Sequence, residues 1–232
     1  MISALVTCWN YGHLLGACMN SMLAQSTPFD EILIVDDCST DQTEVLASYY
    51  SSFVDGRVRV VRNDVRRGVV WNLNTYLPTL RSRWVVKVDA DDWLDPSFVW
   101  AHEQAIERSA NVPTVALFYS PARYCLTDPP NPRADLHGTV IGTGAWSLSR
   151  LRSGNFVHGS AVVLRDALAA VGGFPDVPLQ EDWACWLKLA EAGFTGVPVE
   201  GPPLLNVRLH RWGSRDLGTD SVRATPGWRH DA

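Results

Sequence analysis

The sequence is poor in lysine and has no excess of positive charge. Lys87 and Lys188 are the only lysines among its 232 residues, and the formal net charge at pH 7 is -5. Nucleic-acid-binding domains usually carry a basic surface, so this balance argues against nucleic acid as the main partner. Hydrophobic residues make up 46% of the chain and charged residues 19%, a composition typical of a folded domain with a sizeable core.

Cysteine pairs and long apolar segments are also missing. The five cysteines are odd in number and no two are spaced as Cys-x-x-Cys, so we expect neither disulfides nor structural zinc, and we expect a reducing, cytoplasmic compartment. No apolar run approaches the length of about 20 residues that spans a bilayer. The N-terminus lacks the basic region of a signal peptide, and no Gly-x-Gly-x-x-Gly dinucleotide-binding fingerprint is present.

Short apolar segments alternate with amphipathic ones through the first 120 residues. The apolar segments predict buried strands, and the amphipathic ones predict helices. We expect strands at 2–7, 31–35, 57–61, 84–88 and 114–119, and a later one at 156–164. We expect helices at 14–23, 40–50, 69–80, 96–109 and 181–192. This order predicts βαβ units and therefore an α/β fold with a mainly parallel sheet.

Two later stretches lack this periodicity. Prolines and glycines break up the segment 121–144, which we interpret as a long loop, and long loops inside compact domains are usually functional. The stretch after Gly201 is rich in Pro, Gly and Arg, and we expect it to wrap the domain or fray. The domain itself is predicted to span 1–215, with 216–232 as a C-terminal tail.

Polar side chains follow three of the first four predicted strands. Thr7 and Asn10 follow the first strand, Asp36 and Asp37 the second, and the segment 89–92 the fourth. Ligands of open α/β sheets bind outside the carboxyl ends of the strands, so this convergence predicts a site there. Asp37 in particular could accept hydrogen bonds from a base or a ribose, although an Asp-Asp pair after a strand is also typical of a simple turn.

Three carboxylates, of Asp89, Asp91 and Asp92, stand within four residues. Their mutual repulsion favours a bound counter-ion. Mg²⁺ or Mn²⁺ with oxygen ligands fits best, because it keeps positions open for substrate phosphate. The alternative is a solvated acidic turn that caps the next helix. The apolar strand directly before the cluster favours the metal site.

Three later positions allow two interpretations each. Glu181 and Asp182 open a predicted helix, where an acidic residue is either an N-cap or, for Asp182, a general base that the helix N-terminus keeps ionised. His210 is a candidate metal ligand only if the end of the chain folds back over the acidic cluster. His158 is either structural or faces an acceptor.

Several segments, taken together and in order, resemble the family 2 glycosyltransferases, which have the GT-A fold. The resemblance runs over about 3–214. The segments that carry it are 6–11 (VTCWNY), 21–26 (SMLAQS), 34–41 (IVDDCSTD), 88–96 (VDADDWLDP), 172–175 (GGFP), 181–183 (EDW) and 208–210 (RLH) with Ser214. The resemblance implies a Rossmann-like α/β/α sandwich that transfers a sugar from a nucleotide-diphosphate donor to an acceptor hydroxyl.

The resemblance also implies roles for individual residues. The implied donor-binding positions are Thr7, Trp9, Asn10, Asp37, Asn74 and Asp89. Asp91 and Asp92 would bind Mn²⁺ or Mg²⁺, with His210 completing the set, and Asp182 would be the catalytic base of an inverting transfer. The donor would be a UDP- or dTDP-sugar, and the acceptor an unidentified glycan or small molecule.

The sequence departs from the family pattern at positions that bear on the donor sugar. Asn63 and Gly68 are further apart than in the usual Asn-x-Gly block, Asn72 stands where a small residue is usual, and Val207 replaces a frequent aromatic residue.

Three other classes of protein compete with this interpretation. A nucleotidyltransferase would need a Gly-rich, basic loop after the first strand, and the segment 7–12 has one Gly and no Lys or Arg. A phosphoacceptor receiver domain would have about half this length. A catalytically inactive relative that binds glycan or nucleotide stays open.

Overall fold

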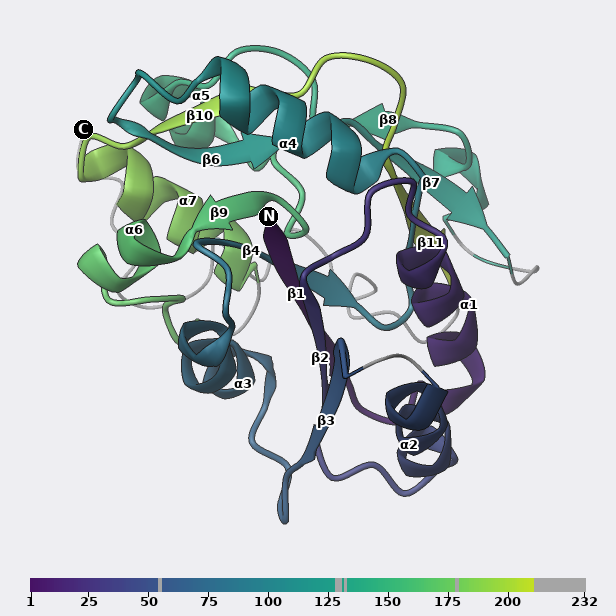
Figure 1. Ribbon diagram of the computed structural model, residues 1–232. Helices are drawn as coiled ribbons and strands as arrows, with labels where there is room; N and C mark the ends of the chain where they lie inside the picture. The colour runs from purple at the N-terminus through teal and green to yellow at the C-terminus, as the bar shows by residue number, and fades with distance from the viewer. Residues whose placement is uncertain (54–55, 128–130, 132, 178–179, 211–232) are drawn as a thin grey trace.

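A seven-stranded sheet forms the centre of the protein in the computed structural model, which describes residues 1–53, 56–127, 131, 133–177 and 180–210 (Figure 1). The strand order is β10-β6-β9-β4-β1-β2-β3. The strands are β1 (Ile2–Cys8), β2 (Glu31–Asp36), β3 (Val58–Arg62), β4 (Trp84–Asp89), β6 (Val115–Tyr119), β9 (Val162–Leu164) and β10 (Thr195–Pro198). β9 runs antiparallel to its neighbours β4 and β6, and the other neighbours in this sheet pair in parallel.

Helices cover both faces of this sheet (Figure 1). One layer holds α1 (Gly12–Leu23), α2 (Thr43–Phe53) and α4 (Phe98–Arg108). The other holds α3 (Val69–Tyr76), α5 (Leu148–Ser153), α6 (Arg165–Ala170) and α7 (Glu181–Glu191), with a 3-10 turn at Leu77–Thr79. Successive side chains of a strand point to opposite faces, so β1 sends Ala4 and Val6 into the first core and Leu5 into the second. The α/β/α sandwich predicted from the sequence is confirmed.

The register of the central strands fixes where the site lies. In β1, Cys8 is aligned with Asp36 of β2, and Thr7 is aligned with Asp89 of β4. The carboxyl ends of three parallel strands therefore meet at one edge of the sheet, and the polar residues that follow them are neighbours in space.

A second, four-stranded sheet corrects two of the sequence-based expectations. Its order is β5 (Trp93–Leu94), β11 (Leu205–Leu209), β7 (Ala122–Leu126) and β8 (Val140–Ile141). The described part of the expected loop 121–144 thus contains two strands and a short 3-10 helix at Ala134–Leu136. In the stretch after Gly201, which was expected to wrap the domain or fray, Leu205–Leu209 forms β11, and residues 211–232 lie outside the described residues. The predicted tail 216–232 lies outside the described residues.

The expected strand at 156–164 was too long. Only Val162–Leu164 pairs with β4 and β6, and the preceding residues form a turn that carries His158 and Gly159. A continuous strand would have paired these residues with β4; as a turn they approach the side chain of Lys87 instead.

Two absences expected from the sequence concern membranes and disulfides. Within the described ranges, no helix combines the length and the apolar character needed to cross a bilayer. All five cysteines are free thiols.

We expect opposite effects from two Gly→Ala substitutions in α1. A Cβ atom on Gly12 would stand 2.8 Å from the backbone nitrogen of Thr43. Gly12→Ala should therefore lower the free energy of unfolding by about 1–3 kcal/mol, the usual cost of overpacking. A Cβ on Gly16 would meet only the Tyr50 hydroxyl, at 3.7 Å. Gly16→Ala should be neutral or stabilise by up to about 1 kcal/mol, because alanine favours a helix. Equal urea midpoints for the two variants would contradict this close approach.

Candidate active site

The turns that follow β1 and β2 are tied to each other by side chains. The Oδ1 atom of Asn10 accepts a hydrogen bond from the backbone nitrogen of Thr40 at 2.8 Å. The backbone nitrogen of Asn10 donates a hydrogen bond to the Ser39 hydroxyl at 2.9 Å. Asn10 has a positive φ of 56°. Asn10 was predicted to bind the donor, and the structure uses its side-chain oxygen to join the two turns.

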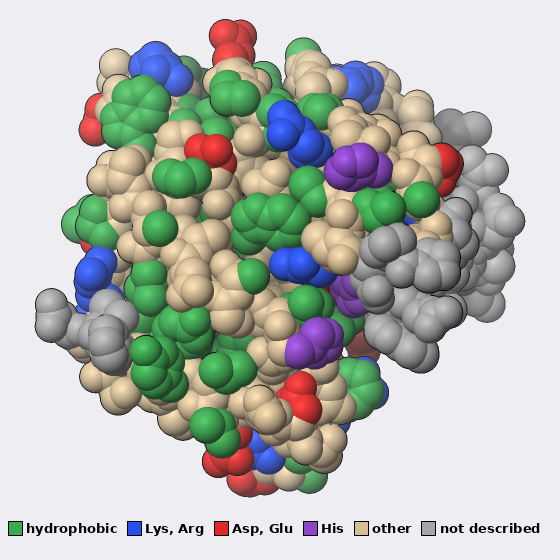
Figure 2. Space-filling view, turned by 90° about the vertical axis from the view of Figure 1, so that its right-hand side faces the viewer, with side chains coloured by type: hydrophobic (Ala, Val, Ile, Leu, Met, Phe, Trp, Pro, Cys, Tyr) green, Lys and Arg blue, Asp and Glu red, His purple; other side chains and the backbone are tan. Residues whose placement is uncertain are grey.

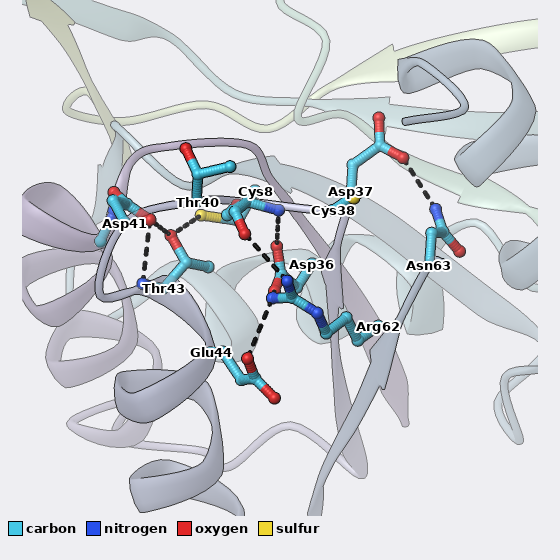
Figure 3. A network of polar contacts seen from close by, with 12 residues as sticks. Cys8, Asp36, Asp37, Cys38, Thr40, Asp41, Thr43, Glu44, Arg62 and Asn63 are labelled. Carbon is cyan, nitrogen blue, oxygen red and sulfur yellow. Dashed lines mark hydrogen bonds and ion pairs between the residues drawn. The ribbon is translucent and has the colours of Figure 1, made fainter. Parts of the chain in front are cut away.

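Asp36 and Asp41 also serve the architecture of this loop (Figure 3). Asp36 is fully buried, accepts the Ser39 nitrogen at 2.9 Å, and forms an ion pair with Arg62. Asp41 accepts the backbone nitrogens of Gly12 at 2.9 Å and Thr43 at 3.0 Å, which holds the start of α1 against the start of α2. Both carboxylates are thus committed to the fold rather than to a ligand.

Asp37 points away from this network, toward the loop that follows β3 (Figure 3). Its Oδ1 atom accepts Nδ2 of Asn63 and the backbone nitrogen of Arg67, and its Oδ2 atom accepts the nitrogen of Gly68, each at 2.8 Å. The unusual spacing between Asn63 and Gly68 therefore forms a loop around this carboxylate. Burial would raise the pKa of Asp37, but the hydrogen bonds outweigh it and hold the pKa below 3.8.

Two tryptophans and two arginines surround the Asp37 loop. Trp9, directly after β1, is 41% exposed, and the guanidinium of Arg66 lies 3.4 Å from its ring centroid. Trp71 is equally exposed, and Arg67 lies 5.1 Å from its ring. Exposed indoles beside guanidinium groups offer flat surfaces on which a planar base can stack.

The lowered pKa of Asp37 predicts a specific pH dependence of stability. The folded pKa lies below the unfolded one, so ionised Asp37 contributes stability above about pH 4 that is lost as the pH falls through the lowered pKa. Asp37→Asn should be less stable than the wild type near pH 7, and the two proteins should converge as the pH falls below 3.8. Urea denaturation at a series of pH values measures this, with Asp64→Asn, an exposed acid of the same loop, as the control. Parallel curves for Asp37→Asn and the wild type would contradict the assignment.

The carboxylates of Asp89, which ends β4, and of Asp91 and Asp92, which follow it, are directed to three different partners. Asp89 pairs with the ammonium of Lys87 at 3.2 Å. The Oδ2 atom of Asp91 lies 2.9 Å from Nε2 of His210. Asp92 is buried, its Oδ1 atom accepts the backbone nitrogen of Arg208 at 2.9 Å, and its Oδ2 atom lies 3.9 Å from Nε2 of His158.

His210 was a candidate metal ligand only if the chain folded back over the acidic cluster. It does so, because β11 returns the end of the described chain to the acidic turn 89–92. Nε of Arg208 donates to the carbonyl oxygen of Asp91 at 2.7 Å. The ring of Tyr11 packs edge-on against that of His210, with centroids 5.4 Å apart. Burial, together with the nearby Asp91 and Asp89, raises the pKa of Tyr11 well above its usual value. Figure 2 shows the face that carries α1, β7 and β11, where histidine and basic side chains lie among hydrophobic ones.

The arrangement differs from the predicted three-ligand metal site. Among the described residues, no group of three or more His, Cys, Asp or Glu side chains could hold a metal ion. The reason is that Asp92 turns to the backbone of β11, which leaves Asp91 and His210 as the facing pair. With metal–ligand bonds of about 2.1 Å at a right angle, two neighbouring ligands lie about 3.0 Å apart, so the observed 2.9 Å fits a pair of adjacent ligands. Substrate phosphate and water commonly supply the other positions of such a site.

The N-terminus of α7 corrects the N-cap interpretation. The N-cap residue is Gln180, in the left-handed region at φ 60°, and its side chain makes no capping hydrogen bond. Glu181 and Asp182 stand in the first turn of the helix. Glu181 accepts the ammonium of Lys87 at 3.1 Å, and Oδ1 of Asp182 accepts the nitrogen of Trp183 at 2.7 Å.

Backbone strain also gathers at this site. Within the described ranges, the non-glycine residues with positive φ are Asn10, Cys38 and Gln180. They lie in the turns after β1 and β2 and directly before α7. Such conformations cost energy, and they cluster at functional sites.

Lys87 lies at this site and was not among the residues predicted from the sequence. Its side chain is only 6% exposed, inside an otherwise apolar strand. A buried lysine is rare unless it is paired, and that rarity is the signal in the segment 85–88 that could have singled it out.

The remaining predicted donor residues differ in their surroundings. Asn74 uses both ends of its amide on the backbone of Phe174, donating to the oxygen and accepting from the nitrogen at 2.8 Å each. These two hydrogen bonds hold α3 against the turn 172–174. Thr7 is half-buried at the end of β1, beside Asp89 on β4.

The sheet order, the antiparallel β9 and the small second sheet together define a GT-A glycosyltransferase fold. The chain belongs to glycosyl transferase family 2, whose family model matches residues 3–169. The match ends before α7 and β11, so Asp182 and His210 lie outside it.

Relatives and solved structures agree with this assignment. TuaG of Bacillus subtilis, whose name links it to teichuronic acid biosynthesis, is 27% identical over 209 residues, which cover 84% of this chain and 74% of TuaG. The structure of S. aureus TarS with UDP-GlcNAc aligns with a TM-score of 0.74 at 16% identity, over 94% of this chain and 61% of that one. The mannosyltransferase PcManGT from Pyrobaculum calidifontis, in complex with GDP-Man and Mn²⁺, gives 0.64 at 24%, over 91% and 58%. The chain thus spans about three fifths of these two solved structures.

Proposed function

We propose that this glycosyltransferase uses a nucleoside-diphosphate sugar with Mn²⁺ or Mg²⁺ and transfers the sugar with inversion to a hydroxyl of an unidentified glycan or small molecule. The meeting of Asp91 and His210 at 2.9 Å, at the same sheet edge as the Asp37 loop, is the observation that carries the proposal. UDP-GlcNAc bound to TarS, and GDP-Man with Mn²⁺ bound to PcManGT, support this donor class.

The donor would lie along the carboxyl ends of β1, β2 and β4. Asp37, already ionised and held by three hydrogen bonds, would accept from the base, and Trp9 with Arg66 would stack on it. Thr7 and Asp89 would face the sugar nucleotide between the Asp37 loop and Asp91. Asp91 and His210 would hold the divalent ion, which when bound neutralises the diphosphate and the charge of the leaving group. We favour a uracil or thymine base over guanine.

The acceptor would be activated from the start of α7. Asp182 would take the proton from the acceptor hydroxyl, whose oxygen forms a bond to the anomeric carbon as the bond from that carbon to the diphosphate breaks. Attack from the side opposite the leaving group inverts the anomeric centre. The N-terminus of a helix stabilises the carboxylate form of Asp182, so it is ready to accept a proton at neutral pH.

Metal-dependent nucleotide binding is the first test. Calorimetry with UDP should show an affinity at least about tenfold higher with Mn²⁺ than with EDTA, a gain of about 1.4 kcal/mol. Asp91→Asn should lose this gain. Asp95→Asn is the matched control, since Asp95 caps the turn before α4 through Ser97, at 2.9 Å, and asparagine caps equally well. Equal UDP affinity with and without EDTA would overturn the metal site, and tighter binding of GDP than of UDP or dTDP would revise the base.

Asp182→Asn tests the base. The amide can still accept the hydrogen bond from Trp183, so the free energy of unfolding should change by less than about 1 kcal/mol. Turnover should fall roughly 100-fold or more, the usual contribution of general-base catalysis, while UDP affinity stays near that of the wild type. Glu191→Gln, at the far end of the same helix in an exposed pair with Arg152, is the control. Near-normal transfer by Asp182→Asn would move the search to Glu181 and His158, and absence of transfer in the wild type with every donor and acceptor tried would favour an inactive binding protein.

A further inference from the structure

Lys87 connects two parts of the site that lie far apart in the sequence. It stands on β4, two residues before Asp89, and its ammonium also contacts Glu181 at the start of α7 at 3.1 Å. The chain holds only one other lysine, Lys188. A charge that is buried in the sheet and shared by β4 and α7 is costly, and it persists only because carboxylates surround it.

Asp182 lies beside the same turn as Lys87, the turn before β9 that contains Gly159. A Cβ atom on Gly159 would stand 2.6 Å from Cε and 3.0 Å from Nζ of Lys87, and 3.1 Å from Oδ2 of Asp182. The ammonium and that carboxylate oxygen therefore flank the same small space, which a side chain at 159 would fill. Burial would lower the pKa of Lys87, but Asp89, Glu181 and Asp182 outweigh it and raise the pKa above the usual value.

We propose that Lys87 is a positioning residue for the acceptor side: it clamps Asp89 and Glu181 together and thereby sets the place and the charge of Asp182. The proposal rests on the proposed role of Asp182 as base. The N-cap of α7 makes no side-chain hydrogen bond, so this helix start is anchored by the ion pair between Glu181 and Lys87, together with the hydrogen bond from Nε1 of Trp183 to the carbonyl oxygen of Leu151. Without the cation, three neighbouring carboxylates would repel one another and displace the first turn.

The other titratable groups nearby do not replace this cation. Cys185 faces the cluster from the same helix, and burial raises the pKa of its thiol to about 12, so it stays neutral. His158, in the Gly159 turn, has Nε2 at 3.9 Å from Asp92. Lys188 lies in the last turn of α7 and donates to the carbonyl oxygen of Gly173 at 3.3 Å.

Kinetic measurements on Lys87→Met distinguish a role of Lys87 in positioning Asp182 from a role in the stability of the fold alone. We expect kcat to fall about 10-fold or more, as when the partner that orients a functional side chain is removed, with a smaller change in UDP affinity. The acid limb of the pH profile of kcat/KM should move to higher pH, because loss of a nearby cation raises the pKa of the base. Lys87→Arg, which keeps the charge, should restore the limb toward that of the wild type, and Lys188→Met should leave both readouts unchanged. A folded Lys87→Met enzyme with an unshifted limb and normal kcat would overturn the proposal.

A measurement without turnover tests the clamp even if Lys87→Met fails to fold. With ¹⁵N-lysine labelling the protein gives two side-chain ammonium signals, which Lys188→Met assigns. The Lys87 signal should exchange its protons with water slowly, and Glu181→Gln and Asp182→Asn should each shift it while the Lys188 signal stays in place. A Lys87 signal that exchanges as fast as that of Lys188, or ignores both substitutions, rules out the clamp and leaves the proposed transfer reaction standing. A protected signal combined with normal turnover of Asp182→Asn refutes the base and, with it, the catalytic part of this proposal.

Discussion

Repulsion among carboxylates gathered at one sheet edge is the constraint that organises this site. Parallel pairing of β1, β2 and β4 brings five aspartates to the same edge. Each carboxylate has a different partner: Arg62 for Asp36, the Asn63–Gly68 loop for Asp37, Lys87 for Asp89, His210 for Asp91 and the backbone of Arg208 for Asp92. Because each carboxylate has its own partner, the five aspartates can lie close together at this sheet edge without destabilising the fold.

These partners come from widely separated parts of the chain, and that is what links the two halves of the site. Arg62 ends β3 and Asn63 follows it, whereas Arg208 lies on β11 and His210 directly after it, 116 and 119 residues beyond their partners Asp92 and Asp91. In the second sheet, β11 pairs with β5, which directly follows the acidic turn 89–92. This pairing brings Arg208 and His210 next to the acidic turn. Lys87 joins Asp89, at the edge where we propose that the donor binds, to Glu181, next to the proposed base Asp182.

The parts of the fold that could be predicted from the sequence are those in which apolar side chains follow one simple pattern along the chain. β1, β2 and β4 are predominantly apolar strands buried on both faces, with Lys87 inside β4 as an exception, so their location and their polar ends could be predicted directly. β11 alternates buried Leu205, Val207 and Leu209 with half-buried residues, but the prolines and glycines before it masked that period. Side-chain commitments were beyond prediction: whether Asn10 and Asn74 face a ligand or a neighbouring backbone depends on contacts made 30 and 100 residues away. A lysine inside the predicted buried strand 84–88 was a visible signal for Lys87, but its partner Glu181 lies 94 residues away and could not be predicted.

The antiparallel strand β9 has a consequence for how the protein assembles. β1 to β4 lie within the first 89 residues and can pair with one another once that part of the chain has been synthesised. The other edge of β4 stays unpaired until Val162–Leu164 has been synthesised and pairs with Trp84–Val86. During synthesis, the strands that carry the proposed nucleotide site would therefore take shape first, and β9 and α7, with the proposed base Asp182, would be added last.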